Sequence, residues 1–226
     1  MNETKVFIHV GLHKTGTTFL QNEVFPKIPE INYQRKVDLT TSVVEGKINL
    51  FSDENLDGGS YRLFSKPTDR YKIAMNLYKM FPNAGIIVCL RDEKSWLRSA
   101  WKQYVMSYYG YTFNEYCKKM DKETLNFKGY VLYLSNLFSD NVLVTNYETL
   151  VKDPQSFVKG ICDFIGVETP TFENKETYKS LSYSQTNAII LFDKIFRSKA
   201  VHLILSLVIR FIRNDPTIQK FREKQL

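Results

Sequence analysis

The chain has 226 residues, of which 43% are hydrophobic and 24% are charged, as is ordinary for a globular protein and unlike a disordered one. This length supports one substantial core, so we expect a single domain over residues 1–226. The net charge of +7 is concentrated in residues 194–226, which hold eight Lys/Arg against two Asp/Glu. Because the excess charge belongs to this tail and not to the body of the domain, we expect no nucleic-acid partner.

The cysteine pattern and the first residues bear on the compartment. Cys89, Cys117 and Cys162 are odd in number and lack the C-x-x-C spacing, so the sequence predicts neither a disulfide framework nor a metal site. The first apolar run begins almost at the N-terminus, which leaves no room for a secretory leader. We therefore expect a cytoplasmic protein.

The chain opens with a strand, a turn and a helix. Residues 6–10, VFIHV, form a nearly continuous apolar run, which predicts a strand buried on both faces of a parallel sheet. Gly11 and Gly16 bracket a turn, and residues 17–24 are expected to be helical, ending near the prolines that follow.

This turn is a candidate phosphate cradle. Gly11 and Gly16 have the spacing of a P-loop, but the lysine stands inside the loop at Lys14. Backbone N–H groups of such a turn and the start of a helix attract anions, and hydroxyls at Thr17 and Thr18 can add hydrogen bonds. An ordinary strand-to-helix turn with polar residues remains the alternative.

The remaining elements alternate between strands and helices, while residues 27–47 show little periodicity. Apolar runs predict strands at 48–51, 85–90 and 142–145, and helical spacing or capping residues predict helices at about 69–80, 93–109, 125–138 and 153–165. This alternation predicts an α/β fold, a P-loop-type parallel β-sheet flanked by helices on both faces.

Polar residues follow two predicted strands at the sheet edge where the cradle lies. Asp53 and Glu54 come after the strand at 48–51 and are candidates for chemistry; a solvated acidic loop or a helix N-cap is the alternative. Arg91 ends the strand at 85–90 and Ser99 lies about two turns into the next helix. An arginine there can bind a phosphate through two hydrogen bonds, with the serine as a further donor.

The helix at 93–109 is rich in aromatic residues. Aromatic side chains at helical spacing ordinarily pack in a core, so we predict core packing, with carbohydrate stacking as the alternative. The residues concerned are Trp96, Trp101, Tyr104, Tyr108 and Tyr109.

The C-terminal part, at about residues 184–226, reads as a basic, apolar helical segment. Within 199–213 the polar side chains recur at steps of three or four and leave an otherwise apolar helix surface. The apolar stretch is too short to span a membrane, which takes about 20 residues. We expect packing on the domain or dimerisation, or else peripheral contact with anionic lipid.

Three stretches resemble sulfotransferases that use 3′-phosphoadenosine 5′-phosphosulfate (PAPS), of the bacterial, carbohydrate-sulfotransferase-like type. Residues 11–18, GLHKTGTT, are similar to the family's 5′-phosphosulfate loop, in which the lysine is internal. Arg91 and Ser99 resemble its 3′-phosphate motif, and residues 142–167 resemble its run of a strand, Tyr-Glu, Asp-Pro and Phe-x-Gly. The resemblance spans about residues 5–190.

The resemblance implies a PAPS donor, the product adenosine 3′,5′-bisphosphate (PAP), and a hydroxylated or amine acceptor such as a glycan or glycolipid. The 5′-phosphosulfate would be held by the loop and the 3′-phosphate by Arg91 and Ser99; the loop residues are His13, Lys14, Thr15, Gly16, Thr17 and Thr18. The family's closing basic loop would correspond to residues 174–183, which contain two lysines and no glycine.

Sulfuryl transfer needs positive charge at the bridging oxygen and a group that takes the acceptor's proton. Lys14 is the expected charge stabiliser. Glu54 leads as the base, as the family's Ser-x-Glu also implies; His13 is second, or a hydrogen-bond donor to the sulfonate, and Asp53 is third. A metal-dependent P-loop kinase and a non-catalytic nucleotide-binding module are the competing functions.

Overall fold

The computed structural model describes residues 3–38, 41–108, 110–173 and 181–195. The chain divides into two compact units: residues 1–104 with 113–180, and residues 105–112 with 181–226. The larger unit carries the sheet and every candidate site residue. The predicted helix at 199–213, with its membrane or dimer contact, and most of the predicted closing loop at 174–183 lie outside the described residues.

The sheet has five strands, all parallel, in the order β2-β3-β1-β4-β5. The strands predicted from apolar runs are confirmed as β1 (Lys5–Val10), β3 (Ile48–Asp53), β4 (Gly85–Leu90) and β5 (Val142–Asn146). Sequence analysis missed β2 (Ile31–Gln34), because this edge strand is half-buried along its whole length and shows no apolar run. With β1 in the centre, the loop that follows it lies between the ends of β3 and β4.

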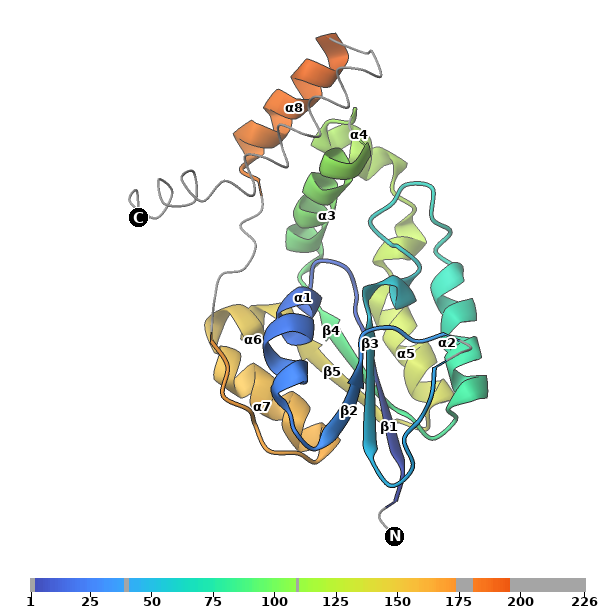
Figure 1. Cartoon of the computed structure of the whole chain (residues 1–226). Helices are drawn as coiled ribbons and strands as arrows, with labels where there is room; N and C mark the ends of the chain where they lie inside the picture. The colour runs from blue at the N-terminus through green and yellow to red at the C-terminus, as the bar shows by residue number, and fades with distance from the viewer. Residues whose placement is uncertain (1–2, 39–40, 109, 174–180, 196–226) are drawn as a thin grey trace. The chain divides into compact units, whose positions relative to one another are not determined.

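Helices cover both faces of the sheet, as predicted (Figure 1). One face carries α6 (Tyr147–Lys152) and α7 (Pro154–Ile165), and the other carries α2 (Asp69–Met80) and α5 (Phe127–Leu137). Sequence analysis missed the short helices α4 (Phe113–Lys119) and η4 (Lys122–Leu125), which connect α3 (Glu93–Tyr108) to α5.

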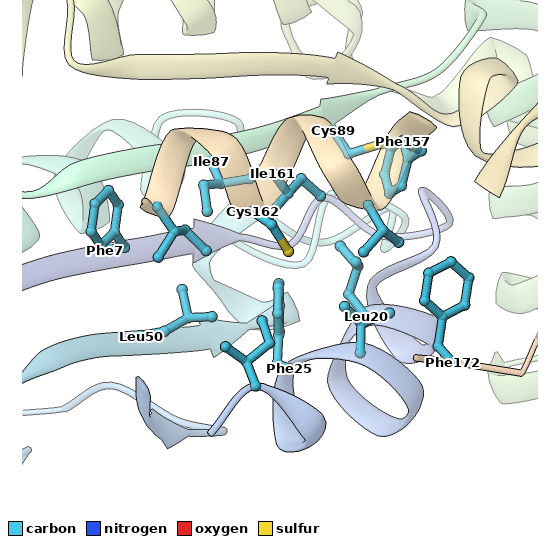
Figure 2. Close-up of a cluster of buried hydrophobic side chains, with 14 of the residues drawn as sticks. Phe7, Leu20, Phe25, Leu50, Ile87, Cys89, Phe157, Ile161, Cys162 and Phe172 are labelled. Carbon is cyan, nitrogen blue, oxygen red and sulfur yellow. The ribbon is translucent and has the colours of Figure 1, made fainter. Parts of the chain in front are cut away.

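The first face of the sheet buries its side chains against α7 and against the helical segment predicted at 17–24, which follows the loop after β1. Figure 2 shows Phe7, Leu50 and Ile87 of the strands facing Ile161 of α7 and Leu20 of that segment. Alternate strand residues point to opposite faces, so Phe51 lies on the other side, where its ring stacks on Phe81 at the end of α2 with centroids 5.5 Å apart. Both faces are therefore apolar, which explains the continuous apolar runs of the central strands.

The helical segment predicted at 17–24 is present but irregular. It begins as an α-turn, α1 (Thr17–Phe19), continues as a π-helical stretch, η1 (Leu20–Val24), and ends as a 3₁₀ turn, η2 (Phe25–Lys27). π-Helical turns inside helices occur often at functional sites. Here the irregular winding places Gln21 inward, where it is 4% exposed and contacts the end of β3.

The aromatic helix α3 confirms the core-packing prediction where it lies in the larger unit. Trp96 and Trp101 are fully buried and Tyr104 is 7% exposed, whereas Tyr108, at the end of the helix, is 39% exposed and contradicts the prediction; Tyr109 lies outside the described residues. Trp101 meets Phe113 edge to face at 5.5 Å. The buried rings are therefore unavailable for stacking on a sugar, although Trp96 has a polar role in the site described below.

The described part of the smaller unit includes α8 (Tyr183–Ile195), the first part of the predicted C-terminal segment. Ile189 and Ile190 are buried in it, whereas Leu191 and Phe192 are exposed. Among the described residues, no helix has the length and apolar character needed to cross a membrane.

Candidate functional site

The loop after β1 is held by its own hydroxyls. The Thr15 hydroxyl donates to the carbonyl of Leu12 at 2.6 Å, and the Thr17 hydroxyl lies 3.4 Å from the same oxygen. Both threonines are buried. Both hydroxyls therefore help to shape the loop, and the role of the Thr17 hydroxyl in bonding a phosphate stays a prediction. Thr18 is half-buried at the start of α1.

The next two carbonyls of the loop are held from outside it. The indole N–H of Trp96 donates to the carbonyl of His13 at 2.9 Å, and Nη1 of Arg91 donates to the carbonyl of Lys14 at 2.8 Å. Lys14 has a left-handed backbone with φ of 67°, which costs on the order of 1–3 kcal/mol and persists only where the surroundings impose it. The structure thus brings together two of the site residues expected from the sequence, Lys14 in the loop after β1 and Arg91 at the end of β4.

Gly16 is a loop position that cannot carry a side chain without strain. Its φ is 89°, and a Cβ built on it would lie 2.4 Å from Cδ2 of Leu150 in α6. The helical segment begins immediately afterwards at Thr17. The first N–H groups of a helix have no intrahelical acceptor. Because the helical segment starts directly after Gly16, these N–H groups lie at the loop, where they can bind an anion.

His13 is oriented by Asp57, a residue that sequence analysis missed. The Asp57 carboxylate accepts the backbone N–H of His13 at 3.0 Å and lies 2.8 and 2.9 Å from its ring Nδ1. Asp57 is 2% exposed and also accepts hydrogen bonds from the N–H of Gly59 and the hydroxyl of Ser60. Burial acts to raise the pKa of this carboxyl, but the hydrogen bonds and charge of His13, with the Ser60 hydroxyl, bring the pKa below its usual value.

An ionised carboxylate can only accept hydrogen bonds, so Nδ1 of His13 is the protonated nitrogen and Nε2 faces away from Asp57. The ring also packs on Tyr61, with centroids 4.7 Å apart. His13 is therefore fixed both in position and in tautomer. The only sequence signal for Asp57 was its place three residues after Glu54 on the short helix η3 (Glu54–Asp57).

The end of β4 gathers positive charge. Arg91 is half-exposed, its Nε donates to the Ser95 hydroxyl at 2.8 Å, and its guanidinium carbon lies 4.2 Å from the ring centre of Tyr147. Partial burial, and then the charges of Arg91 and Arg98, lower the pKa of Lys102. A lysine held among like charges marks a place where an anion would be stabilised.

Ser99 lies on α3 with Arg98 and Lys102 and is half-buried. Ser95 and Ser99 are four residues apart, so they follow one side of α3, and Ser95 is the one that Arg91 contacts. Ser95 is a second residue that sequence analysis missed. The spacing from Arg91 was a usable signal, because a hydroxyl one turn away can hold a guanidinium in place.

Glu54 lines an open cleft of about 440 Å³ at the ends of β2 and β3. It is exposed, and its backbone lies against the loop: a Cβ on Gly11 would come 3.1 Å from Cα of Glu54. Asp53 behaves as the alternative reading expected, since its carboxylate caps η3 by accepting the N–H of Asn55 at 2.8 Å. The cleft is lined by Gln21, Gln34, Arg35, Lys36, Asp38, Thr41, Asp53, Glu54 and Asn55.

A buried polar chain runs from the core to the wall of this cleft. Nδ1 of His9 lies 2.8 Å from the Ser52 hydroxyl, to which the amide of Gln21 donates at 3.1 Å. The side-chain Oε1 of Gln21 accepts a hydrogen bond from Nε of Arg35 at 3.2 Å. Burial lowers the pKa of His9 to about 4, so the ring is neutral, and it packs on Phe25. This series of hydrogen bonds fixes the direction in which the Arg35 side chain leaves the sheet.

Comparison with known proteins places the chain in a family. The profile of the sulfotransferase family matches residues 43–171, more than half of the chain. The chain belongs to the sulfotransferase family. The matched range begins after the loop and includes Glu54, Arg91 and Ser99, so family membership rests on elements other than the phosphate cradle.

Two further likenesses agree with the family. Protein-tyrosine sulfotransferase A of Caenorhabditis elegans is 24% identical over 195 residues, covering 74% of this chain and 51% of that protein. The chain thus spans about half the length of this curated relative. A sulfotransferase from Alicyclobacillus acidocaldarius is similar with a TM-score of 0.52 at 15% identity, covering 88% of this chain and 98% of the other. At this identity the likeness concerns the fold, a P-loop-type parallel sheet flanked by helices.

Mouse sulfotransferase SULT7A1 complexed with PAP is also similar, with a TM-score of 0.49 at 18% identity, over 84% of this chain and 65% of that one.

Proposed function

We propose that this chain transfers a sulfuryl group from PAPS to the hydroxyl of an acceptor, with a glycan or glycolipid as the leading acceptor class and an amine as a variant. One observation carries the proposal: the loop after β1 and Arg91 at the end of β4 lie at one sheet edge and touch. The loop of β1 contains Lys14, and the cation group at the end of β4 contains Arg91, whose Nη1 contacts the carbonyl of Lys14. A nucleotide with phosphate groups on both its 5′ and its 3′ oxygens has this charge pattern.

The residues present fit such a donor. A side chain at Gly16 would collide with Leu150. Because Gly16 has no Cβ, no side chain at this position covers the backbone at the start of α1. Lys14, Thr15, Gly16, Thr17 and Thr18 would hold the 5′-phosphosulfate, with His13 beside them, and Arg91 with Ser99 would hold the 3′-phosphate. PAPS supplies an activated sulfuryl group; the chain supplies orientation and charge.

In this proposal Lys14 provides positive charge where the leaving oxygen becomes negative. Glu54 takes the proton of the acceptor hydroxyl, because it is exposed on the cleft wall and its backbone lies against Gly11 of the loop. His13 is the alternative base, or it donates to the sulfonate. The capping role of Asp53 leaves it the weakest of the three candidates.

The acceptor would occupy the open cleft beside Glu54. Its lining is polar and carries charges of both signs, which suits a hydroxyl-rich molecule better than an apolar one. The name of the C. elegans relative favours a second class, the phenol of a tyrosine in a protein. Assays with a hydroxylated glycan and with a tyrosine peptide, each with PAPS, separate the two classes.

Ligand-induced thermal stabilisation tests the function. PAP without magnesium should raise the melting temperature, whereas magnesium–ATP should do so if the chain is a P-loop kinase. Stabilisation by PAP without turnover of any acceptor would favour a non-catalytic binding module. If PAP leaves the melting temperature unchanged at millimolar concentration, the proposed function is wrong.

The base is tested by kinetics. Glu54→Gln should lower kcat by on the order of 10²–10⁴ while PAP affinity stays within about a factor of three, because a base acts on the acceptor and not on the nucleotide. Lys14→Ala should lower both kcat and the affinity for PAP. Near-normal turnover in Glu54→Gln together with its loss in His13→Ala would transfer the role of base to His13.

A further inference from the structure

Two of the three guanidinium nitrogens of Arg91 donate hydrogen bonds to other residues of the protein. Its Nη1 donates to the carbonyl of Lys14 at 2.8 Å and its Nε to the Ser95 hydroxyl at 2.8 Å. Within the described ranges, no residue accepts a hydrogen bond from Nη2. The guanidinium is half-exposed and lies 4.2 Å from the ring centre of Tyr147. A planar group held at two of its nitrogens and against a ring has a defined direction for the third.

We infer that Arg91 couples recognition of the 3′-phosphate to the placement of the loop after β1, which carries Lys14. Nη2 takes the 3′-phosphate while Nη1 holds the Lys14 carbonyl, so a single rigid side chain connects the two ends of the nucleotide. Ser95 acts as a positioning residue that keeps this bridge aligned. The inference rests on the proposed function, because it takes the 3′-phosphate of PAPS or PAP as the ligand of Arg91.

The backbone of Lys14 is the reason that such a bridge matters. With φ of 67°, Lys14 occupies a region that residues other than glycine rarely adopt. The two carbonyls that precede it are held by other donors: Thr15 holds that of Leu12 and Trp96 that of His13. The Lys14 carbonyl accepts its hydrogen bond from Arg91. A phosphate that adds a bond at Nη2 of Arg91 therefore also strengthens the hold on the peptide that carries the lysine.

This coupling predicts discrimination between nucleotides beyond simple affinity. A ligand without the 3′-phosphate can fill the loop but adds no hydrogen bond to Nη2 of Arg91, so the loop gains less protection from it even at saturation. A lysine at position 91 offers one compact charge in place of a fork. It can bind the phosphate or the carbonyl, but it does not bridge them.

Amide hydrogen exchange of the peptide covering residues 11–20 tests the inference without any turnover. PAP and adenosine 5′-monophosphate differ only in the 3′-phosphate, and each is added at saturation as judged by calorimetry. In the wild-type protein, PAP should slow exchange of this peptide about fivefold more than the monophosphate does, the factor expected of one net hydrogen bond. In Arg91→Lys the two ligands should protect the loop equally, and in Ser95→Ala the difference should shrink.

Arg98→Lys is the matched control. Arg98 is exposed and contributes charge to the same cation group, so this variant should retain the wild-type difference between the two ligands. Each variant is compared with its own unliganded state, and its melting temperature reports whether it is folded.

Equal loop protection by PAP and the monophosphate in the wild type would overturn the coupling, and so would a difference that survives in Arg91→Lys. Both results would leave the proposed function standing, because PAP would still bind. Failure of PAP to bind the wild-type protein at all would reject the proposed function together with the coupling.

Discussion

Replacing Asp57 by asparagine should destabilise the protein at neutral pH. The carboxylate accepts four hydrogen bonds shorter than 3.1 Å, two from His13, one from the N–H of Gly59 and one from the Ser60 hydroxyl. Asparagine has nearly the same shape but places an NH₂ donor where one carboxylate oxygen accepted. At least one charge-assisted bond of about 1.5–3 kcal/mol is lost, a large share of the ~5–15 kcal/mol that stabilises a typical domain.

The pH dependence of this loss has a definite sign. The folded pKa of Asp57 lies below its usual value, so its contribution to stability is fully present above the unfolded pKa of about 4 and is lost as the pH falls through the folded pKa. Asparagine does not titrate. The difference in unfolding free energy between wild type and Asp57→Asn should therefore be largest at neutral pH and should narrow below about pH 4.

Urea denaturation at several pH values measures both quantities. Asp163→Asn is a suitable control, because Asp163 pairs with Lys159 on the surface with 59% of its side chain exposed, and such pairs contribute little. A difference below about 0.5 kcal/mol at pH 7, within the usual range of surface substitutions, would refute the reasoning. A difference that stays constant down to pH 3 would refute the assignment of an ionised carboxylate.

Two further substitutions and one labelling experiment test other parts of the structure. Gly16→Ala should lower the unfolding free energy by about 1–3 kcal/mol, because it combines a left-handed backbone with a clash against Leu150; urea denaturation checks it. Gln21→Ala should cost about 1–3 kcal/mol by the same assay, because it removes the link from the core to Arg35. In the native protein at pH 8 a thiol reagent should label Cys117 before the two buried cysteines, whose pKa values are raised by burial to about 12 and about 11.

Local sequence patterns predicted the frame of this molecule. Both faces of the central strands are covered, so their apolar runs are long and their ends are sharp, as at Leu90 and Arg91. The loop was predictable for a similar reason: Gly16 must be glycine where φ is 89° and Leu150 packs against it. Such positions constrain residue type through the backbone, which leaves a signal in the sequence.

Side-chain partners distant in the sequence were not predictable in the same way. The partner of His13 is 44 residues away at Asp57, and the donor to its carbonyl is 83 residues away at Trp96. No periodicity relates such positions. Trp96 was assigned correctly to the core, yet its ring N–H supports the loop. The half-buried strand β2 was missed for the opposite reason, because its environment imposes no apolar pattern.

The position of Glu54 follows from the parallel sheet. Because β1 and β3 are adjacent and in register, with Val10 opposite Asp53, the residue after β3 must leave the sheet beside the loop after β1. The N–H of Gly11 bonds the carbonyl of Asp53 at 3.3 Å and closes this junction. Capping then separates the two acids: Asp53 is held by η3, while Glu54 is exposed on the cleft. The proposed function needs a base that lies beside the loop and can be reached by a second substrate, and for that reason we propose Glu54 and not Asp53 for this role.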